Sequence, residues 1–161
     1  MLFRSEELPA AVARVQAEAR DLRRTIKGLQ ERLAVLEADS LARRGTPVGR
    51  MTVVVEALEG WDAAGLKGLA TAVAARPGYV AALFSTSAPA LVALARSGDV
   101  QLDCGAVLRT LVERFGGRGG GKPDLAQGGG LNGTAEEIVA AARDAVRAGF
   151  TREAASSSSP S

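Results

Sequence analysis

The chain has 161 residues, of which 47% are hydrophobic, and this suffices for one ordinary domain with a core and an additional segment. It contains no histidine and one cysteine, which argues against a catalytic triad, histidine-based acid–base catalysis and a zinc site, so no cofactor and no metal are expected. A net charge of only +2 excludes a polycation, and charged residues within every long apolar run exclude a membrane-spanning helix. The N-terminus lacks a secretory signal pattern, which favours the cytoplasm.

The N-terminal part carries an uninterrupted heptad pattern. Apolar or small residues recur from Leu8 to Leu36 at alternating spacings of four and three, which predicts a coiled-coil helix over residues 5–45. Ser5 is suited to cap the start of this helix and Gly45 to end it. So long a helix needs a partner, and β-branched residues at some a positions with leucine at many d positions favour a two-stranded homodimer. The residues expected in this seam are Val12, Val15, Leu22, Ile26, Leu29, Leu33 and Leu36.

Beyond the helix, short apolar runs alternate with helical patterns, which predicts an α/β (α+β) fold with a small mixed sandwich domain over residues 46–150. Strands are expected at residues 50–58, 79–85 and 90–95; the last run suits a helix or a strand by periodicity and is assigned to a strand by its length. Helices are expected to begin after Asp62, after Asp103 and at the Thr134–Glu137 capping box. The serine-rich tail, residues 151–161, is expected to be disordered.

The segment 116–130, with the sequence GGRGGGKPDLAQGGG, is the most distinctive part of the chain. Glycine at this density indicates a backbone with positive φ or one that closely approaches another group. Amides of such a loop can surround an anion, and nearby cations add positive charge, whereas a flexible linker would lack the central PDLAQ. The predicted phosphate-binding residues are Arg114, Gly117, Arg118, Gly119, Gly120, Gly121, Lys122, Asp124, Gln127, Gly128 and Gly129.

Several of these residues have a purely structural alternative. A cation such as Arg114 is also favoured at a helix C-terminus by the helix dipole. Asp124 and Gln127 are able to hydrogen-bond a sugar or a base edge, or instead the backbone of the loop itself. Cys104 stands at a helix start that could activate its thiol, but a buried core position is the favoured interpretation. The segment is neither a P-loop nor a dinucleotide fingerprint, because it follows a helix and lacks Gly-Lys-Ser/Thr, and no catalytic residue is predicted.

The glycine segment resembles the glycine-rich signature of the C-terminal domain of alanyl-tRNA synthetases and of free-standing alanyl-tRNA editing proteins, the DHH-associated domain. A heptad helix leading into a small α/β domain is similar to the arrangement in that family, so the resemblance covers nearly all of residues 5–150. It implies a tRNA-binding and dimerising module that contacts the outer corner of the L-shaped tRNA. The implied partner is an alanine-accepting tRNA.

The chain also departs from that family in ways that limit the prediction. Hydrolysis of mischarged tRNA belongs there to a separate zinc-bearing domain with histidine and cysteine ligands, and this sequence has no histidine. Related DHH phosphoesterases hold a phosphate with their glycine loop, but their Asp-His-His half has no counterpart here. The chain is therefore not expected to be an enzyme by itself. Two alternatives are the substrate-binding half of a split deacylase or DHH-type phosphoesterase, working with a separately encoded editing or catalytic domain, and a structural coiled-coil dimeriser without a ligand.

Overall fold

The computed structural model describes residues 7–157, and the expected helix start at Ser5 lies outside them. The elements of the chain are, in order, α1 (Glu7–Arg43), β1 (Thr46–Val48), β2 (Met51–Leu58), α2 (Ala63–Ala74), β3 (Tyr79–Ser85), β4 (Ala90–Arg96), α3 (Cys104–Phe115), β5 (Arg118–Gly121), β6 (Leu125–Leu131) and α4 (Ala135–Ser157). The expected class, a long N-terminal helix followed by a mixed α+β domain, is confirmed.

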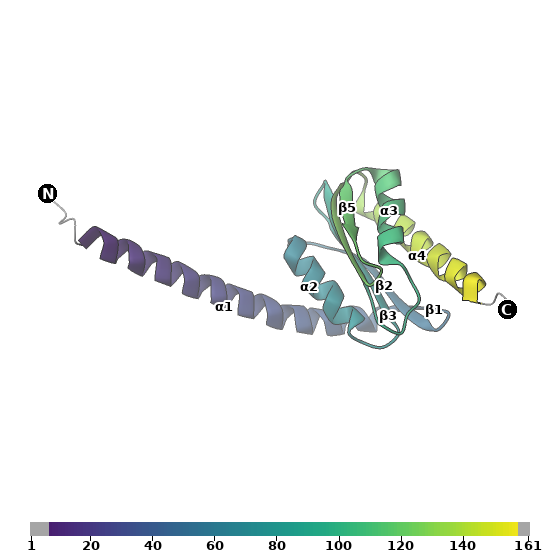
Figure 1. Cartoon of the computed structure of the whole chain (residues 1–161), viewed down its shortest axis with the longest axis horizontal. Coiled ribbons are helices and arrows are strands. Elements are labelled where there is room, and N and C mark those ends of the chain that lie inside the picture. Colours follow the sequence, from purple (N-terminus) through teal and green to yellow (C-terminus); the bar gives the residue numbers. More distant parts are fainter. Residues whose placement is uncertain (1–6, 158–161) are drawn as a thin grey trace. The chain divides into compact units, whose positions relative to one another are not determined.

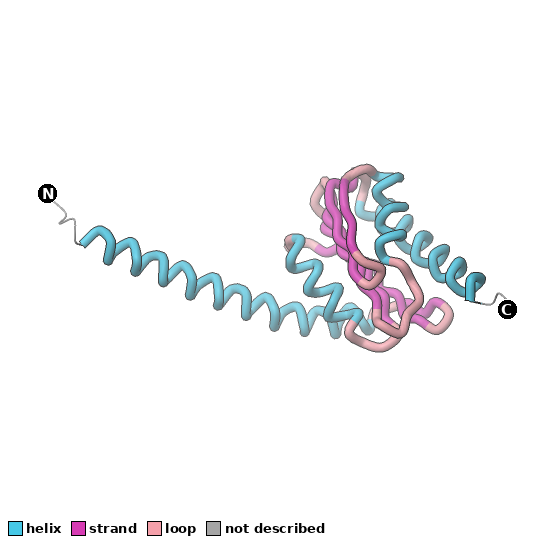
Figure 2. Tube along the Cα trace, viewed as in Figure 1, coloured by secondary structure: helices cyan, strands magenta, loops and turns pink. Residues whose placement is uncertain are grey.

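One six-stranded sheet organises the domain, with the strand order β1-β2-β3-β4-β6-β5. The strands β2 and β3 are parallel and are joined through α2, and every other neighbouring pair is antiparallel. Because β6 inserts between β4 and β5, the chain places β5 at one edge of the sheet and β1 at the opposite edge. Figure 2 shows the strands as magenta tubes between the helices.

Helices cover both faces of this sheet (Figure 1). The side chains of Val53 and Val55 belong to the core beneath α3 and α4, whereas Val54 packs with Leu66 of α2 on the other face. Such double-sided burial requires apolar residues at consecutive positions, which explains the unbroken apolar run in β2. The last turns of α1 also enter the α2 side of the core through Leu41, which is completely buried.

The predicted helix caps are confirmed. Asp62 accepts a hydrogen bond from the Gly65 amide at 2.7 Å, and Asp103 accepts one from the Ala106 amide at 3.1 Å. At the start of α4, the Thr134 amide donates to the Glu137 carboxylate at 3.0 Å and the Glu137 amide donates to the Thr134 hydroxyl at 3.2 Å. These bonds satisfy amides that the first turn of a helix leaves without partners.

The structure differs from the sequence-based expectation at several boundaries. β1, β5 and β6 were not predicted as strands. The chain divides into two compact units after Leu33, so residues Ala34–Arg43 of α1 belong with the domain and not with the preceding part of the helix. α4 continues to Ser157, so residues 151–157 are helical where a disordered tail was expected, and the rest of that tail lies outside the described residues.

Candidate functional site

The glycine segment forms a β-hairpin and not the loop that the sequence suggested. Strands β5 and β6 pair with Gly119 opposite Gly128 and with Gly120 opposite Gln127. Lys122 closes the ladder, because its amide donates to the Leu125 carbonyl at 2.9 Å and its carbonyl accepts from the Leu125 amide at 3.3 Å. The hairpin is therefore an ordered part of the sheet, with a short turn over residues 123–124.

The density of glycine in this hairpin allows a helix to approach it closely. A Cβ atom on Gly119 would lie 2.8 Å from Leu108 Cδ2 of α3 and 2.7 Å from the Gln127 carbonyl oxygen. A Cβ atom on Gly128, directly opposite, would lie 3.2 Å from Leu108 Cδ1. Gly117 has a φ of +92°, which side-chain-bearing residues rarely adopt. The inference that glycine marks close approach or positive φ is confirmed, and at Gly119 and Gly128 the approaching group is the protein's own Leu108.

Alternate backbone amides of β5 form a row along the open edge of the sheet. Lys122 and Leu125 exchange both of their backbone bonds, and the backbone direction alternates at each residue of a strand. Gly120 and Arg118 therefore direct their amides toward β6, whereas Gly119 and Gly121 direct theirs away from it. The outward amides lie along a line and do not surround a single concavity.

The predicted cations lie at the two ends of this edge. Arg118 and Lys122 are both exposed, and four residues of extended chain place their Cα atoms about 14 Å apart. Arg114 is exposed in the last turn of α3, three residues before β5 begins, and its guanidinium lies over the Phe115 ring at 5.3 Å from the centroid. The two predicted cations of the hairpin thus flank β5 at its two ends.

Two other predicted residues have structural contacts. The Gln127 side chain donates a hydrogen bond to the Ala63 carbonyl at the start of α2 at 3.3 Å. The Asp124 carbonyl accepts from the Arg96 amide at 3.1 Å, while the residue itself is exposed at the tip of the hairpin. Gln127 therefore joins β6 to α2, which is a structural role of the kind that the sequence left open.

Cys104 lies in the core at the start of α3. Its side chain is buried, and burial raises the pKa of its thiol to about 12. A thiol with so high a pKa is protonated at neutral pH and is a poor nucleophile. The interpretation of Cys104 as a core residue is confirmed.

The predicted seam of α1 is exposed along its whole length in the single chain. The exposed fraction ranges from 49% at Val12 to 68% at Leu36. Val35 is similarly exposed, at 59%, but does not belong to the heptad seam. A row of large apolar side chains that stays in water is characteristic of a surface that pairs with another chain.

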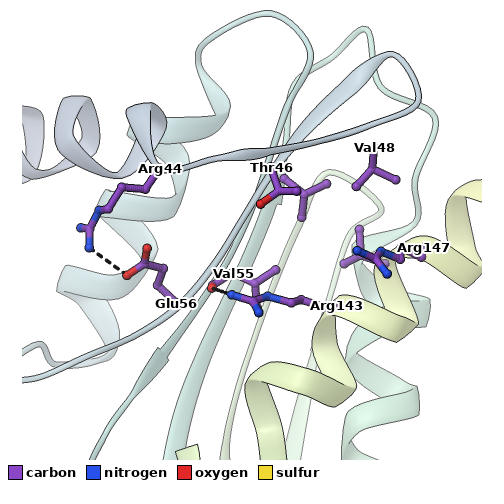
Figure 3. Close-up of a pocket in the computed structure, with 9 residues that line it drawn as sticks. Arg44, Thr46, Val48, Val55, Glu56, Arg143 and Arg147 are labelled. Carbon is purple, nitrogen blue, oxygen red and sulfur yellow. Dashed lines mark hydrogen bonds and ion pairs between the residues drawn. The ribbon is translucent and has the colours of Figure 1, made fainter. Parts of the chain in front are cut away.

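A second candidate site, which the sequence did not predict, lies at the opposite edge of the sheet (Figure 3). It is a cavity of about 230 Å³ lined by residues from β1, β2, α4 and the chain that follows α1. The lining residues are Arg44, Thr46, Val48, Val53, Val55, Glu56, Arg143, Val146 and Arg147. No sequence motif indicates this site, because its arginines are far apart in the chain; only the spacing of four between Arg143 and Arg147 places two of them on one helix face.

None of the helices within residues 7–157 combines the length and the apolarity needed to cross a bilayer.

A helix-flanked mixed sheet that ends in a glycine hairpin defines a class of domain with known members. Residues 50–148 match the DHHA1 domain family, and the chain belongs to this family. The domain is also similar to the crystal structure of the C-Ala domain from Aquifex aeolicus alanyl-tRNA synthetase, with a TM-score of 0.58 and 24% identity. That similarity covers 64% of this chain and 97% of the C-Ala chain, and it shows a shared fold.

Curated relatives are alanine–tRNA ligases. The chain is 37% identical to that of Acidothermus cellulolyticus over 153 residues, which is 89% of this chain and 17% of the relative. It is 38% identical to that of Methanoculleus marisnigri over 125 residues, or 78% of this chain and 13% of the relative. The chain thus spans less than a fifth of the length of these relatives.

Proposed function

We propose that this chain is a tRNA-binding and dimerisation module of the alanyl-tRNA system. The observation that supports it most strongly is the similarity of 89% of the chain to an alanine–tRNA ligase, within the DHHA1 family. Because the chain spans only 17% of that relative, aminoacylation itself is not part of the proposal. An alanine-accepting tRNA is the proposed ligand.

The β5 edge is the proposed contact surface for the RNA backbone. Arg118 and Lys122 supply exposed positive charge, and the outward amides of Gly119 and Gly121 supply hydrogen-bond donors between them. Gly120 has open space where a side chain would stand, so a ligand backbone is able to approach the strand there. The Cα atoms of the two cationic residues are about 14 Å apart, which suits contacts to separate phosphates of one strand.

Filter binding with an alanine-accepting tRNA tests this proposal. The affinity of the full chain should fall as salt rises, because phosphate contacts release counterions. Arg118→Ala and Lys122→Ala should each weaken binding and lower the slope of log K against log salt by about one. Arg50→Ala is the matched control, because Arg50 is an exposed cation in the turn between β1 and β2, at the edge of the sheet opposite β5. Tight binding that is independent of ionic strength would contradict the proposal.

The seam of α1 is the proposed dimer interface. A two-stranded coiled coil would bury its apolar side chains and would give each dimer two copies of the β5 edge. Because these 161 residues contain no histidine, any role in hydrolysing mischarged tRNA would require an editing domain outside them. The proposed site of action is the cytoplasm, where cell fractionation should find the chain.

A structural dimeriser without a ligand is the second candidate. The packing of Gly119 and Gly128 against Leu108 favours it, because that packing accounts for part of the glycine density without any ligand. Amide chemical shifts distinguish the two candidates. Changes concentrated in residues 116–130 when tRNA is added would support RNA binding, and an unchanged hairpin in a stable dimer would support the structural role.

A further inference from the structure

The cavity at the β1 edge of the sheet has the composition of an anion site, and nothing in the proposed function uses it. We propose that this cavity binds a phosphate group, which Arg143 and Arg147 of α4 hold by charge-assisted hydrogen bonds. Both guanidinium groups lie at the cavity in Figure 3, on the helix face that is directed toward β2. Arginine suits this role because its planar fork matches two phosphate oxygens at once.

The charges around the cavity do not balance. Arg44 is neutralised, because its guanidinium lies 3.1 Å from the Glu56 carboxylate and 3.6 Å from the Glu37 carboxylate. Among the side chains described for residues 9–152, no carboxylate lies within 4.0 Å of the Arg143 or Arg147 guanidinium. The lining therefore holds two cations that lack a counterion in this part of the chain.

These two cations are also neighbours on one helix face. Arg143 and Arg147 are four residues apart, and like charges at that spacing repel each other on a helix. An anion between the two side chains would convert this repulsion into two attractions. Val146 stands between them in the sequence and is buried in the core, so it fixes the rotation of α4 that places both arginine side chains at the cavity.

The end of β1 explains why the cavity exists. The register pairs Thr46 with Val53, so β1 does not extend alongside Val55. Arg143 reaches this open stretch of β2 and donates a hydrogen bond to the Val55 carbonyl at 3.5 Å. The guanidinium thereby lies at the cavity, next to the buried valines Val53 and Val55 that line it.

The size of the cavity selects the ligand class. A volume of about 230 Å³ lies below the roughly 300–1,000 Å³ of pockets that enclose a small organic ligand. A phosphate group fits this space, and its source is either inorganic phosphate or one phosphate of an RNA strand. Only the RNA source depends on the proposed function.

The cavity is independent of the glycine hairpin. The two sites lie at opposite edges of the six-stranded sheet, which the strand spacing places about 24 Å apart. RNA contacts at both edges would give the domain two phosphate-binding surfaces.

Titration of the full ¹⁵N-labelled chain with inorganic phosphate, against sodium chloride at equal ionic strength, tests the site directly. We expect saturable amide shifts around Thr46, Val55 and residues 143–147 with phosphate and not with chloride. Arg147→Gln should weaken this response several-fold, whereas Lys67→Gln, which removes one charge from the other face of the sheet, should leave it unchanged. Arg143→Gln should weaken it as well, with circular dichroism to check that β2 and α4 remain folded. Equal responses to both salts, or an unchanged response in Arg147→Gln, would overturn the inference.

Binding of an alanine-accepting tRNA identifies the source of the phosphate. If RNA supplies it, Arg147→Gln should lower tRNA affinity several-fold and reduce the salt slope by about 0.7–0.9. A phosphate response with unchanged tRNA affinity in Arg147→Gln would support the site and assign it to inorganic phosphate. If Arg118→Ala weakens tRNA binding but phosphate gives no response, the cavity inference fails and the proposed function stands. If phosphate gives the expected response but tRNA does not bind, the proposed function fails and the cavity inference stands.

Discussion

Leu108 of α3 lies against Gly119 of β5 so closely that a Cβ atom on the glycine would be 2.8 Å from Leu108 Cδ2. The neighbouring strand adds to this restriction, because the same Cβ atom would be 2.7 Å from the Gln127 carbonyl oxygen. By contrast, a Cβ atom on Gly120, the next residue, would have no neighbour within 4 Å. Adjacent glycines of one strand therefore have different structural roles.

We predict that Gly119→Ala destabilises the domain and that Gly120→Ala does not. The methyl group at Gly119 would push both α3 and β6 away from β5, at a cost of about 1–3 kcal/mol, typical of overpacking. The methyl group at Gly120 meets open space, and its restriction of the unfolded chain would stabilise the fold by up to about 1 kcal/mol. Urea denaturation of both variants measures the difference. Equal stabilities would show that helix packing does not account for glycine at position 119.

The seam of α1 should control oligomeric state. Replacing both Leu22 and Leu29 with glutamine removes four large apolar side chains from a dimer, each worth about 1.5 kcal/mol or more, so the dissociation constant should rise by a thousandfold or more. Val35→Gln is the matched control, because Val35 is 59% exposed but lies outside the seam. Sedimentation equilibrium should show a monomeric double variant and a dimeric control. A wild-type chain that is monomeric at micromolar concentration would exclude the dimer.

The buried thiol of Cys104 should make stability fall in alkaline solution. Its pKa is raised from 9.0 to about 12, so the folded state retains a proton that the unfolded state loses above pH 9. Stability is therefore unaffected below pH 9 and declines as pH rises toward 12. Between pH 8 and pH 10 the wild type should lose about 1 kcal/mol more than Cys104→Ala, as measured by urea denaturation. The comparison with the variant cancels the titration of other groups, and parallel losses in the two proteins would contradict the assignment.

The capping box of α4 should stabilise the helix that carries Arg143 and Arg147. Thr134→Ala removes the acceptor of the Glu137 amide and should cost about 1 kcal/mol of unfolding free energy. Thr71→Ala is a suitable control, because the Thr71 hydroxyl bonds only to the Lys67 carbonyl within α2 and alanine favours a helix interior. Thermal denaturation should show a lower midpoint for Thr134→Ala alone. A similar change in both variants would indicate that the capping box is not the cause.

Gln127 distinguishes a structural from a binding role within the hairpin. Gln127→Ala removes the hydrogen bond to the Ala63 carbonyl and should cost about 0.5–1.5 kcal/mol of stability. Because this side chain is already engaged with α2, the tRNA affinity of the folded variant should equal that of the wild type. Filter binding at a temperature well below the midpoint measures this. A large loss of tRNA affinity without a loss of stability would indicate that the Gln127 side chain contacts RNA.

Much of the fold was predictable because single segments carry their own signals. The run Tyr79–Ser85 is apolar throughout and forms a buried strand with the expected bounds. The capping residues Asp62, Asp103 and Thr134 mark helix starts by local hydrogen bonds that need no tertiary context.

The edge strands and the arginine cavity could not be predicted in the same way. β5 consists of one arginine and three glycines, and glycine has a low intrinsic preference for strands, so pairing with β6 determines its conformation. β1 has only three residues. The cavity depends on Arg44 and Arg143, which only the completed sheet and α4 bring together. Residues 116–130 did indicate an unusual backbone, but not that part of their glycine content serves the packing of α3.

The bare edge of β5 also has a consequence for solubility. An edge strand without bulky side chains leaves its backbone groups free to pair with a strand of another molecule. Natural proteins prevent such edge-to-edge association with charged side chains near the edge. Arg118 lies at the start of β5 and Lys122 directly follows its end. Neutralising the two together should therefore promote aggregation, which light scattering would detect at concentrations where the parent chain stays clear.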